Sequence, residues 1–384
     1  MNKHKKFINL AICLLFILII INSMAYTPNI TYSNTIKISN NHMINISYVS
    51  AETDITQNTE IKEDIYKIYD ETDSLIMERQ SVEINDIIID KNFNQFEIVE
   101  VDDNNHTAHC VFKKSLPKPK VIKNDFSNIA DTNITKKIGV YMTHNDESYE
   151  TGDGYDSVYG KGGIHDIAKL LVNNLQTYGV TTYFDESLHI PHDSYAYSRS
   201  KNTAESLLKN DLDAIFDIHR DGASRKTYVK NIDGVDRCKV RIVVGQANKN
   251  KDDNLNFALN LMSVAEKICP WLFLDIYYAK GHYNQNLKNT SLLFEMGSHL
   301  VEKSLVEKTV PYLANVINTT LYKTSIDENN NLVINPTNIN ENIATNYKTE
   351  RHNNYLAIIL IFVAIAIVIC FVFYKIIKLQ QKRH

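Results

Sequence analysis

The sequence predicts an α/β domain with a mainly parallel sheet flanked by helices, set between polar segments and apolar chain ends. Strand-like runs alternate with amphipathic helical runs between residues 127 and 324. Three of the strand-like runs are followed directly by polar clusters, at the position where open α/β sheets present their ligands. Two of the most apolar stretches lie at the extreme ends, which indicates a membrane-tethered protein.

The predicted domain opens with a strand at residues 137–142 and a helix at 164–178, whose apolar residues recur at helical spacing before Gly179. Further strands are expected at 180–184, 214–218, 240–244 and 291–294, and further helices at 204–208, 255–268 and 302–322. This regular alternation favours parallel strands joined by helical crossovers.

Charge and cysteine content exclude several classes of protein. Lys and Arg number 41 against 45 Asp and Glu, a net charge of −4, so no broad basic field favours nucleic acid as a partner. Two of the five cysteines, Cys13 and Cys370, lie in the apolar ends, and there is no CxxC pair. A disulfide framework and a thiolate zinc site are therefore disfavoured, which suits an extracytoplasmic bacterial protein that folds on its core.

Residues 1–25 have the form of a signal sequence. Three lysines precede an apolar run, and Ser23-Met24-Ala25 has the small-x-small pattern that a signal peptidase reads. Cleavage after Ala25 is slightly favoured, and retention as a signal anchor stays open.

Residues 355–374 are expected to form a transmembrane helix, because the run from Leu356 to Tyr374 carries no charge and is close to the length that spans a bilayer. A basic tail follows at 375–384, and by the positive-inside rule it is cytoplasmic. The chain between the two apolar ends is then extracytoplasmic.

Two polar segments connect the predicted domain to these ends. Residues 26–126 are rich in Asn, Thr, Asp and Ile and contain no clean helix, so we interpret them as an extracytoplasmic stalk; whether the stalk folds is left open. The Asn-rich residues 325–354 are expected to be a polar linker to the membrane.

The polar clusters provide a candidate metal site and a candidate acid–base group. They are residues 143–149, 219–221 and 295–297. A catalytic zinc ion takes about three His or carboxylate ligands, and His144, Glu147 and His219 could supply them. Glu295 could then take the proton from the attacking water and pass it to a leaving amine.

Other assignments within these clusters stay open. His165, which opens a helix, is an alternative to Glu147 as the second ligand. Most of the further histidines are expected to lie on the surface or in a substrate cleft; these are His165, His189, His192, His282 and His299. Arg220 and Asp221 are interpreted either as an ion pair that orients His219 or as a plain surface pair.

Motifs for other chemistry are missing. The sequence contains no G-x-S-x-G, no GxxxxGK[ST] and no GxGxxG, and no cysteine is placed to pair with His and Asn. Serine, nucleotide and thiol chemistry are therefore disfavoured.

Four separated motifs resemble those of the stage II sporulation protein P family. They are Tyr141-Met142-Thr143-His144 continuing to Glu147-Ser148-Tyr149, Phe216-Asp217-Ile218-His219-Arg220-Asp221, Gly281-His282-Tyr283-Asn284-Gln285-Asn286-Leu287 and Leu292-Leu293-Phe294-Glu295-Met296-Gly297. The resemblance runs from about residue 137 to residue 322, roughly half of the chain.

This resemblance implies the fold of zinc-dependent N-acetylmuramoyl-L-alanine amidases, which cut the amide between muramic acid and the stem peptide, with endopeptidase activity on cross-links. His144 and His219 match the family's metal histidines, Glu295 matches the catalytic glutamate, and Glu147 belongs to the His-x-x-Glu-Ser motif. It further implies digestion of septal peptidoglycan in the intermembrane space during engulfment, beside the membrane-bound sporulation proteins D and M.

Two other functions remain alternatives. One is a wall-binding scaffold of the sporulation complex that has lost catalysis, against which the intact His144, His219 and Glu295 argue. The other is a zinc peptidase that cuts only bonds within the stem peptide. It would differ in the bond cleaved and not in the metal chemistry.

Overall fold

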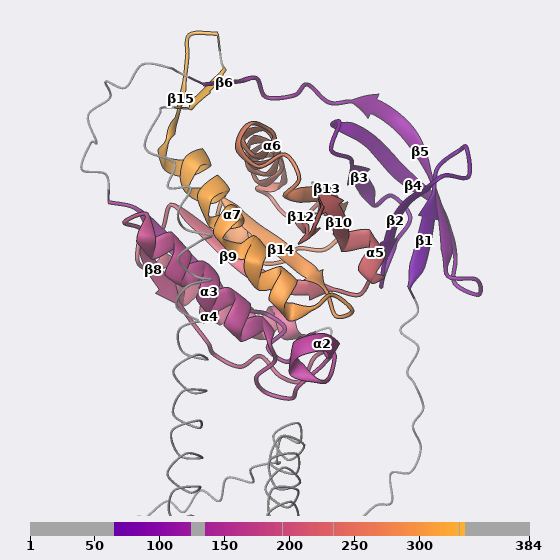
Figure 1. Ribbon diagram of the computed structural model, residues 1–384, viewed down its shortest axis with the longest axis horizontal. Helices are drawn as coiled ribbons and strands as arrows, with labels where there is room; N and C mark the ends of the chain where they lie inside the picture. Colours follow the sequence, from indigo (N-terminus) through magenta and orange to yellow (C-terminus); the bar gives the residue numbers. More distant parts are fainter. Residues whose placement is uncertain (1–64, 124–134, 194, 233, 330, 335–384) are drawn as a thin grey trace, which may run out of the picture. The chain divides into compact units, whose positions relative to one another are not determined.

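The computed structural model describes residues 65–123, 135–193, 195–232, 234–329 and 331–334. Within them the largest element is an 11-stranded sheet in the order β2-β1-β5-β4-β3-β13-β12-β14-β9-β7-β8 (Figure 1). Its strands are β1 (Tyr66–Tyr69), β2 (Leu75–Arg79), β3 (Ile87–Ile89), β4 (Asn94–Asp102), β5 (Thr107–Ser115), β7 (Lys137–Tyr141), β8 (Thr181–Phe184), β9 (Ala214–Asp221), β12 (Val240–Gly245), β13 (Phe273–Ala279) and β14 (Ser291–Ser298).

The half of the sheet from β8 to β13 is mainly parallel, as the sequence predicts. Strands β8, β7, β9 and β14 are parallel to one another, and β12 is parallel to β13 but antiparallel to β14. Strands β1 to β5 extend the sheet through an antiparallel pair between β3 and β13. Because most of their own pairs are antiparallel, the prediction of a mainly parallel sheet holds for this half and not for the whole sheet.

Three helices cover one face of this half: α3 (Ile164–Thr177), α6 (Lys251–Ile268) and α7 (Lys303–Tyr322). Helices α3 and α7 lie side by side in Figure 1. Val310, Leu313 and Ile317 recur at helical spacing on α7 and are fully buried. They share one core with sheet residues such as Phe216 and Phe294, so this layer follows from the 3.6-residue and two-residue periodicities.

The opposite face has a different cover. Helix α4 (Ala196–Leu208) packs on β7 and β9. Over β12, β13 and β14, the side chains of Val243, Tyr277 and Leu293 form a second buried cluster with Ile88 and Ile98 of the N-terminal strands. The N-terminal strands therefore both extend the sheet and cover one of its faces.

The question whether the predicted stalk, 26–126, folds is answered for its described part, 65–123, which forms β1 to β6. Because β1 to β5 belong to the main sheet, the interpretation of this part as a stalk is wrong. Short β6 (Val121–Lys123) joins β15 (Thr324–Ile326) and β16 (Leu332–Ile334) in a small three-stranded sheet, so the predicted linker also begins with ordered strands. Such strands gain stability only from distant partners, which local periodicity does not reveal.

Strand β13 of the main sheet has no counterpart among the strands expected from the sequence. The remaining elements are short. They are α2 (Glu150–Asp153), α5 (Arg225–Tyr228), the hairpin of β10 (Val229–Ile232) and β11 (Val235–Cys238), and the 3-10 helix η1 (Gln285–Leu287). β13 is nearly all buried, and its polar Asp275 interrupts the apolar pattern that would have marked it.

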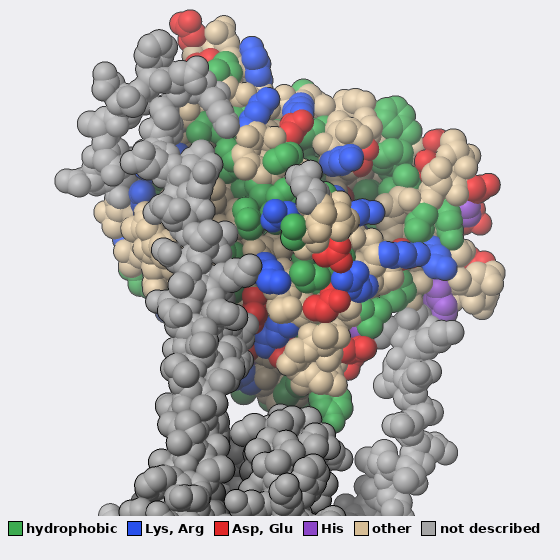
Figure 2. All heavy atoms as spheres, viewed as in Figure 1, with side chains coloured by type: hydrophobic (Ala, Val, Ile, Leu, Met, Phe, Trp, Pro, Cys, Tyr) green, Lys and Arg blue, Asp and Glu red, His purple; other side chains and the backbone are tan. Residues whose placement is uncertain are grey.

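Among the described residues no helix is both long and apolar enough to cross a membrane. The predicted signal segment, 1–25, the transmembrane segment, 355–374, and the tail, 375–384, lie outside the described residues and stay predictions. On the face drawn in Figure 2, Lys and Arg are interspersed with Asp and Glu and form no field of one sign.

Candidate metal centre

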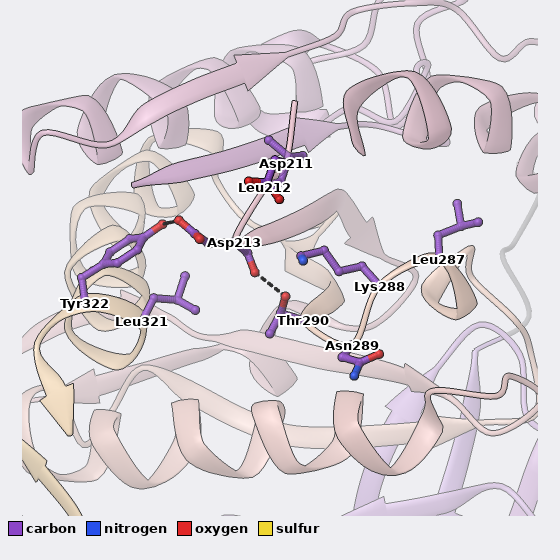
Figure 3. Close-up of a pocket in the computed structure, with 9 residues that line it drawn as sticks. All are labelled: Asp211, Leu212, Asp213, Leu287, Lys288, Asn289, Thr290, Leu321 and Tyr322. Carbon is purple, nitrogen blue, oxygen red and sulfur yellow. Dashed lines mark hydrogen bonds between the residues drawn. The ribbon is translucent and has the colours of Figure 1, made fainter. Parts of the chain in front are cut away.

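An open hollow of about 670 Å³ lies at the amino-terminal end of β9 and β14, away from the polar clusters. It is lined by Asp211, Leu212, Asp213, Leu287, Lys288, Asn289, Thr290, Leu321 and Tyr322 (Figure 3). The partly buried carboxylate of Asp213 accepts from Tyr322 Oη at 2.8 Å and from the backbone N–H of Lys137 at 2.8 Å. These bonds tie the end of α7 to the sheet and give the hollow a structural explanation.

The candidate site is built at the other end of the same strands. Along β9, Asp217, His219 and Asp221 alternate with residues that face the helical core, so their side chains point to the opposite face. Glu295 of β14 is the direct ladder partner of His219. A period of two thus places three polar side chains of β9 beside Glu295.

The turn after β7 brings His144 and Glu147 to this group. Thr143 anchors the turn, because its backbone N–H and its hydroxyl both donate to the carboxylate of Asp217, at 2.8 and 2.6 Å. The N–H of Glu147 then reaches back to the carbonyl of His144 at 3.4 Å. This tight turn directs both side chains toward His219.

Gly162 allows the start of α3 to pack directly on this turn. Its N–H donates to the carbonyl of Asn145 at 2.7 Å, and a Cβ atom at this position would collide with the carbonyl oxygen of Glu147. The next residues continue the contact, since the N–H of Ile164 donates to the same Glu147 carbonyl at 3.0 Å. Gly162 and Ile164 therefore support the backbone of Glu147.

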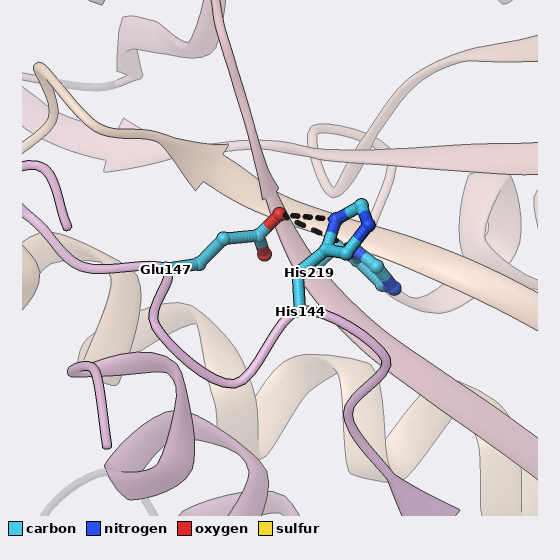
Figure 4. A group of neighbouring side chains, drawn as sticks. All are labelled: His144, Glu147 and His219. Carbon is cyan, nitrogen blue, oxygen red and sulfur yellow. Dashed lines mark hydrogen bonds and ion pairs between the residues drawn. The ribbon is translucent and has the colours of Figure 1, made fainter. Parts of the chain in front are cut away.

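The three predicted ligands come together in the structure (Figure 4). Glu147 Oε1 lies 3.0 Å from His144 Nδ1 and 3.3 Å from His219 Nδ1, and one ligand atom from each residue lies within 4.8 Å of the other two. Ligands at about 2.1 Å from a tetrahedral ion are about 3.4 Å apart, so these distances fit a zinc site. Two imidazoles and one carboxylate, with a fourth position left over, are also the donor set of catalytic zinc.

The groups around the three residues fix their orientation. The second oxygen of Glu147 accepts from the backbone N–H of Arg220 at 2.9 Å. The other ring nitrogen of His219, Nε2, lies 3.0 Å from Asp217 Oδ1, an ion-pair distance without the geometry of a hydrogen bond. A carboxylate behind a ligating histidine is the usual support of such a ligand. Sequence reasoning missed Asp217, although its two-residue offset from His219 on a strand was a usable signal.

Burial and the charges within the cluster act against each other on the pKa values of its members. Burial lowers the pKa of His219, but the carboxylates of Asp217 and Glu147 outweigh burial and raise it well above its ordinary value. Burial raises the pKa of Glu147, but the two histidines outweigh it and hold that pKa well below the usual range. For His144, burial dominates and lowers the pKa.

An aromatic ring packs against each of the two clustered histidines. The rings of His192 and His144 are stacked with centroids 3.8 Å apart, and His192 Nδ1 lies 3.0 Å from Asp146 Oδ1. The ring of Tyr197 lies parallel to that of His219 at 6.1 Å. His192, one of the further candidates, is therefore part of the site's surroundings, and its side chain is 39% exposed.

His165 does not join the cluster. It is buried, and its Nδ1 lies 3.4 Å from Glu186. His189 is also buried, with bonds to Met142 O and Thr203 Oγ1, and His299 is buried as well, so the expectation that most of these histidines lie at the surface or in a cleft is wrong.

The predicted pairing of Arg220 with Asp221 is wrong too, because consecutive strand residues point to opposite faces. Arg220 donates to the carbonyl of Asp156 at 3.1 Å. Asp221 instead binds the fully buried Arg241, whose Nε also lies 2.7 Å from Asp275 Oδ1.

Glu295 is buried, and its Oε2 has no hydrogen-bond partner. Burial raises its pKa to about 8, and the negative charges of Asp221 and Glu147 act in the same direction. The positive charges of His219 and Arg79 act in the opposite direction. A carboxyl group with this pKa is suited to exchange protons near neutral pH.

The fold and site thus define a mixed α/β protein with a His–Glu–His cluster at the carboxyl ends of its central strands. The chain matches the stage II sporulation protein P family over residues 26–318, and it belongs to that family.

One curated relative is the stage II sporulation protein P of Bacillus subtilis (strain 168), 28% identical over 196 residues. The match covers 46% of this chain and 48% of the relative, so the chain spans about half the length of the curated relative that it matches.

Two solved structures are also similar. The CwlD amidase from Clostridioides difficile, solved in complex with the GerS lipoprotein, is 14% identical, with a TM-score of 0.35 and coverage of 48% of this chain and 96% of that chain. The N-acetylmuramyl-L-alanine amidase Ami1 from Mycobacterium smegmatis is 15% identical, with a TM-score of 0.34 and coverage of 50% and 99%.

Proposed function

We propose that this protein is a zinc-dependent peptidoglycan hydrolase, an N-acetylmuramoyl-L-alanine amidase that degrades septal cell wall during endospore formation. The observation that carries the proposal is the buried cluster of His144, Glu147 and His219, with Glu295 paired to His219 on the next strand. Membership of the stage II sporulation protein P family supports the same cellular setting.

In this proposal His144, Glu147 and His219 hold the ion, and Asp217 orients His219. A bound zinc ion supplies the Lewis acidity that makes water a nucleophile at neutral pH and polarises the scissile carbonyl. Glu295 takes a proton from the attacking water as the new C–O bond forms. It then gives that proton to the amine as the C–N bond breaks, so that water and one amide give one carboxylic acid and one amine.

The same proposal places the protein at the membrane, with its folded part extracytoplasmic and its C-terminus cytoplasmic. The uncharged run at 355–374 and the basic tail at 375–384 support this placement. The sporulation proteins D and M are its proposed neighbours, and peptidoglycan is the proposed substrate.

The test is digestion of purified peptidoglycan by the full-length chain, with products identified by mass spectrometry. The full chain is required because the N-terminal strands cover one face of the sheet that carries the site. Free stem peptides are expected with zinc and not after chelation. Glu295→Gln is expected to lower the rate by roughly 100- to 10,000-fold while zinc stays bound.

Glu302→Gln is the matched control, because Glu302 is a half-exposed carboxylate bound to Arg225, and it should digest at the wild-type rate. If all products are cut within the stem peptide, the protein is a peptidase and not an amidase. Wall binding without release of any product by the zinc-loaded chain would contradict the enzyme and favour a scaffold.

A further inference from the structure

A buried arginine of the N-terminal strands lies beside the candidate site with unused hydrogen-bond donors. Arg79, the last residue of β2, is 8% exposed, and its Nε and Nη1 have no hydrogen-bond partner. Buried donors of a charged group are costly to leave unbonded, so native structures rarely keep them without a reason.

The path of the chain fixes where Arg79 lies. The carbonyl of Glu78 accepts from Arg241 Nη1 at 3.2 Å, and Arg241 is the ladder neighbour of Glu295. On the other side of Arg79, Gln80 packs against Gly222, where a Cβ would approach the Gln80 side chain to 2.7 Å. The segment therefore lies across the carboxyl end of β9, which carries His219.

The carboxylate of Glu78 holds this segment in place. It is 2% exposed and accepts from Ser224 Oγ and, at 2.8 Å, from Thr227 Oγ1. Its other oxygen lies 3.3 Å from Lys226 Nζ. Three side chains after β9, that of Ser224 and two on α5, thus fix the residue next to Arg79.

The guanidinium of Arg79 stacks with its flat face on an aromatic ring. Its Cζ lies 3.8 Å from the centre of the Tyr277 ring. Stacking on an aromatic ring fixes the plane of a guanidinium and leaves its N–H edge available for planar recognition of a carboxylate or another oxyanion. The positive charge of Arg79 is also close enough to act on Glu295.

Among the unbonded atoms around the site, the Nε and Nη1 donors of Arg79 and the Oε2 acceptor of Glu295 are complementary. A negatively charged substrate oxygen would satisfy the arginine, and a proton of the attacking water would satisfy the glutamate. A peptide stem carries such oxygens as its carboxylates, and an amide under attack develops one at its carbonyl.

We infer that Arg79 is a substrate-binding residue of the active site, supplied by the N-terminal strands, which binds an anionic oxygen of the peptide stem. The inference rests on the proposed function for the nature of the substrate. It makes β1 to β5 part of the catalytic unit, because β2 carries the arginine and the other strands join β2 to the sheet.

The test compares Arg79→Ala and Arg79→Lys in the full-length chain, with zinc bound. The control is Arg237→Lys, since Arg237 is also stacked, with Cζ 4.8 Å from the Trp271 ring, and also has a buried unbonded Nε, but lies on β11 against α7. The probes are an N-acetylmuramoyl peptide with free carboxylates and the same peptide with its carboxylates amidated. Cleavage gives kcat and KM, and binding is measured calorimetrically in chains that also carry Glu295→Gln.

Loss of roughly 10- to 100-fold in affinity for the free-carboxylate probe, with affinity for the amidated probe unchanged, would identify a stem carboxylate as the ligand. A similar loss in kcat on both probes, with binding unchanged, would identify the oxygen of the carbonyl under attack. Arg79→Lys should recover only part of the loss, because it keeps the charge without the planar fork.

Binding and kcat within twofold of the Arg237→Lys control for both Arg79 variants, at unchanged melting temperature, would overturn the inference. If the chain that keeps Arg79 binds neither probe, the inference is overturned as well. If the wild-type chain binds but cleaves neither probe, the proposed enzyme fails, while the binding comparison still decides the role of Arg79.

Discussion

His219 of β9 and Glu295 of β14 are direct ladder partners in a parallel pair, so a candidate metal ligand and a candidate proton-transfer group lie side by side on one face of the sheet. The face that they share is covered by the N-terminal strands and α4, whereas the large helical core lies on the other face. The site is therefore built where two separately covered regions of one sheet meet.

Replacing any of the three clustered residues is expected to abolish stable metal binding. His144→Ala, Glu147→Ala and His219→Ala should each reduce the zinc content from about one ion per chain to a small fraction, because three protein ligands are needed to hold a catalytic ion. His165→Ala should retain zinc, since His165 pairs with Glu186 outside the cluster. The zinc content per chain is measured by elemental mass spectrometry after dialysis. Full zinc retention by Glu147→Ala, together with loss in His165→Ala, would reverse the ligand assignment.

Zinc binding is expected to release protons and to strengthen as the pH rises through the neutral range. The pKa of His219 is held above its ordinary value by Asp217 and Glu147, so the metal-free site keeps a proton that zinc must displace. Calorimetric titration at pH 7 in buffers of different ionisation enthalpy gives the number released.

Asp217→Asn should reduce the number of protons released. Of the two carboxylates that raise the pKa of His219, this variant keeps only Glu147. Glu302→Asn is a control that leaves the site untouched. Zinc affinity that is constant between pH 6 and pH 8, with no proton released, would contradict this prediction.

Arg241 is expected to be essential for stability. It is fully buried between Asp221 and Asp275, and Arg241→Met would leave two buried carboxylates without their cation. The expected loss in the free energy of unfolding is about 3–5 kcal/mol. Arg225→Met is the matched control, because Arg225 binds Glu302 near the surface and such pairs contribute about 0–1 kcal/mol. Urea denaturation measures both, and equal losses in the two variants would count against the buried pair.

The N-terminal strands should depend on the second core for their docking. Leu293→Ala opens a cavity among Val243, Tyr277 and the N-terminal isoleucines and should lower the free energy of unfolding by about 2–5 kcal/mol. Leu188→Ala, at a side chain that is 52% exposed, should change it by less than about 0.5 kcal/mol. Denaturation measures stability, and limited proteolysis is expected to cut first within 65–123 in Leu293→Ala. Unchanged proteolysis and stability would mean that this cluster does not hold the strands.

The sequence by itself determined the half of the fold whose signals are local. The helices α3 and α7 and the strands β7, β9, β12 and β14 were predicted because each carries its own apolar period. His144, Glu147, His219 and Glu295 could be selected for a similar reason, since parallel strands bring the residues after their carboxyl ends to one edge.

Only the tertiary structure decided the partners of these residues and the role of the N-terminal segment. Strands β1 to β5 and β13 are stabilised by pairing and burial between residues far apart in the chain, which composition and local period do not reveal. Local sequence therefore specified which groups are present. Long-range packing specified that the charge of Arg79, on a distant strand, acts on Glu295, because β2 and β14 belong to one sheet only in the folded chain.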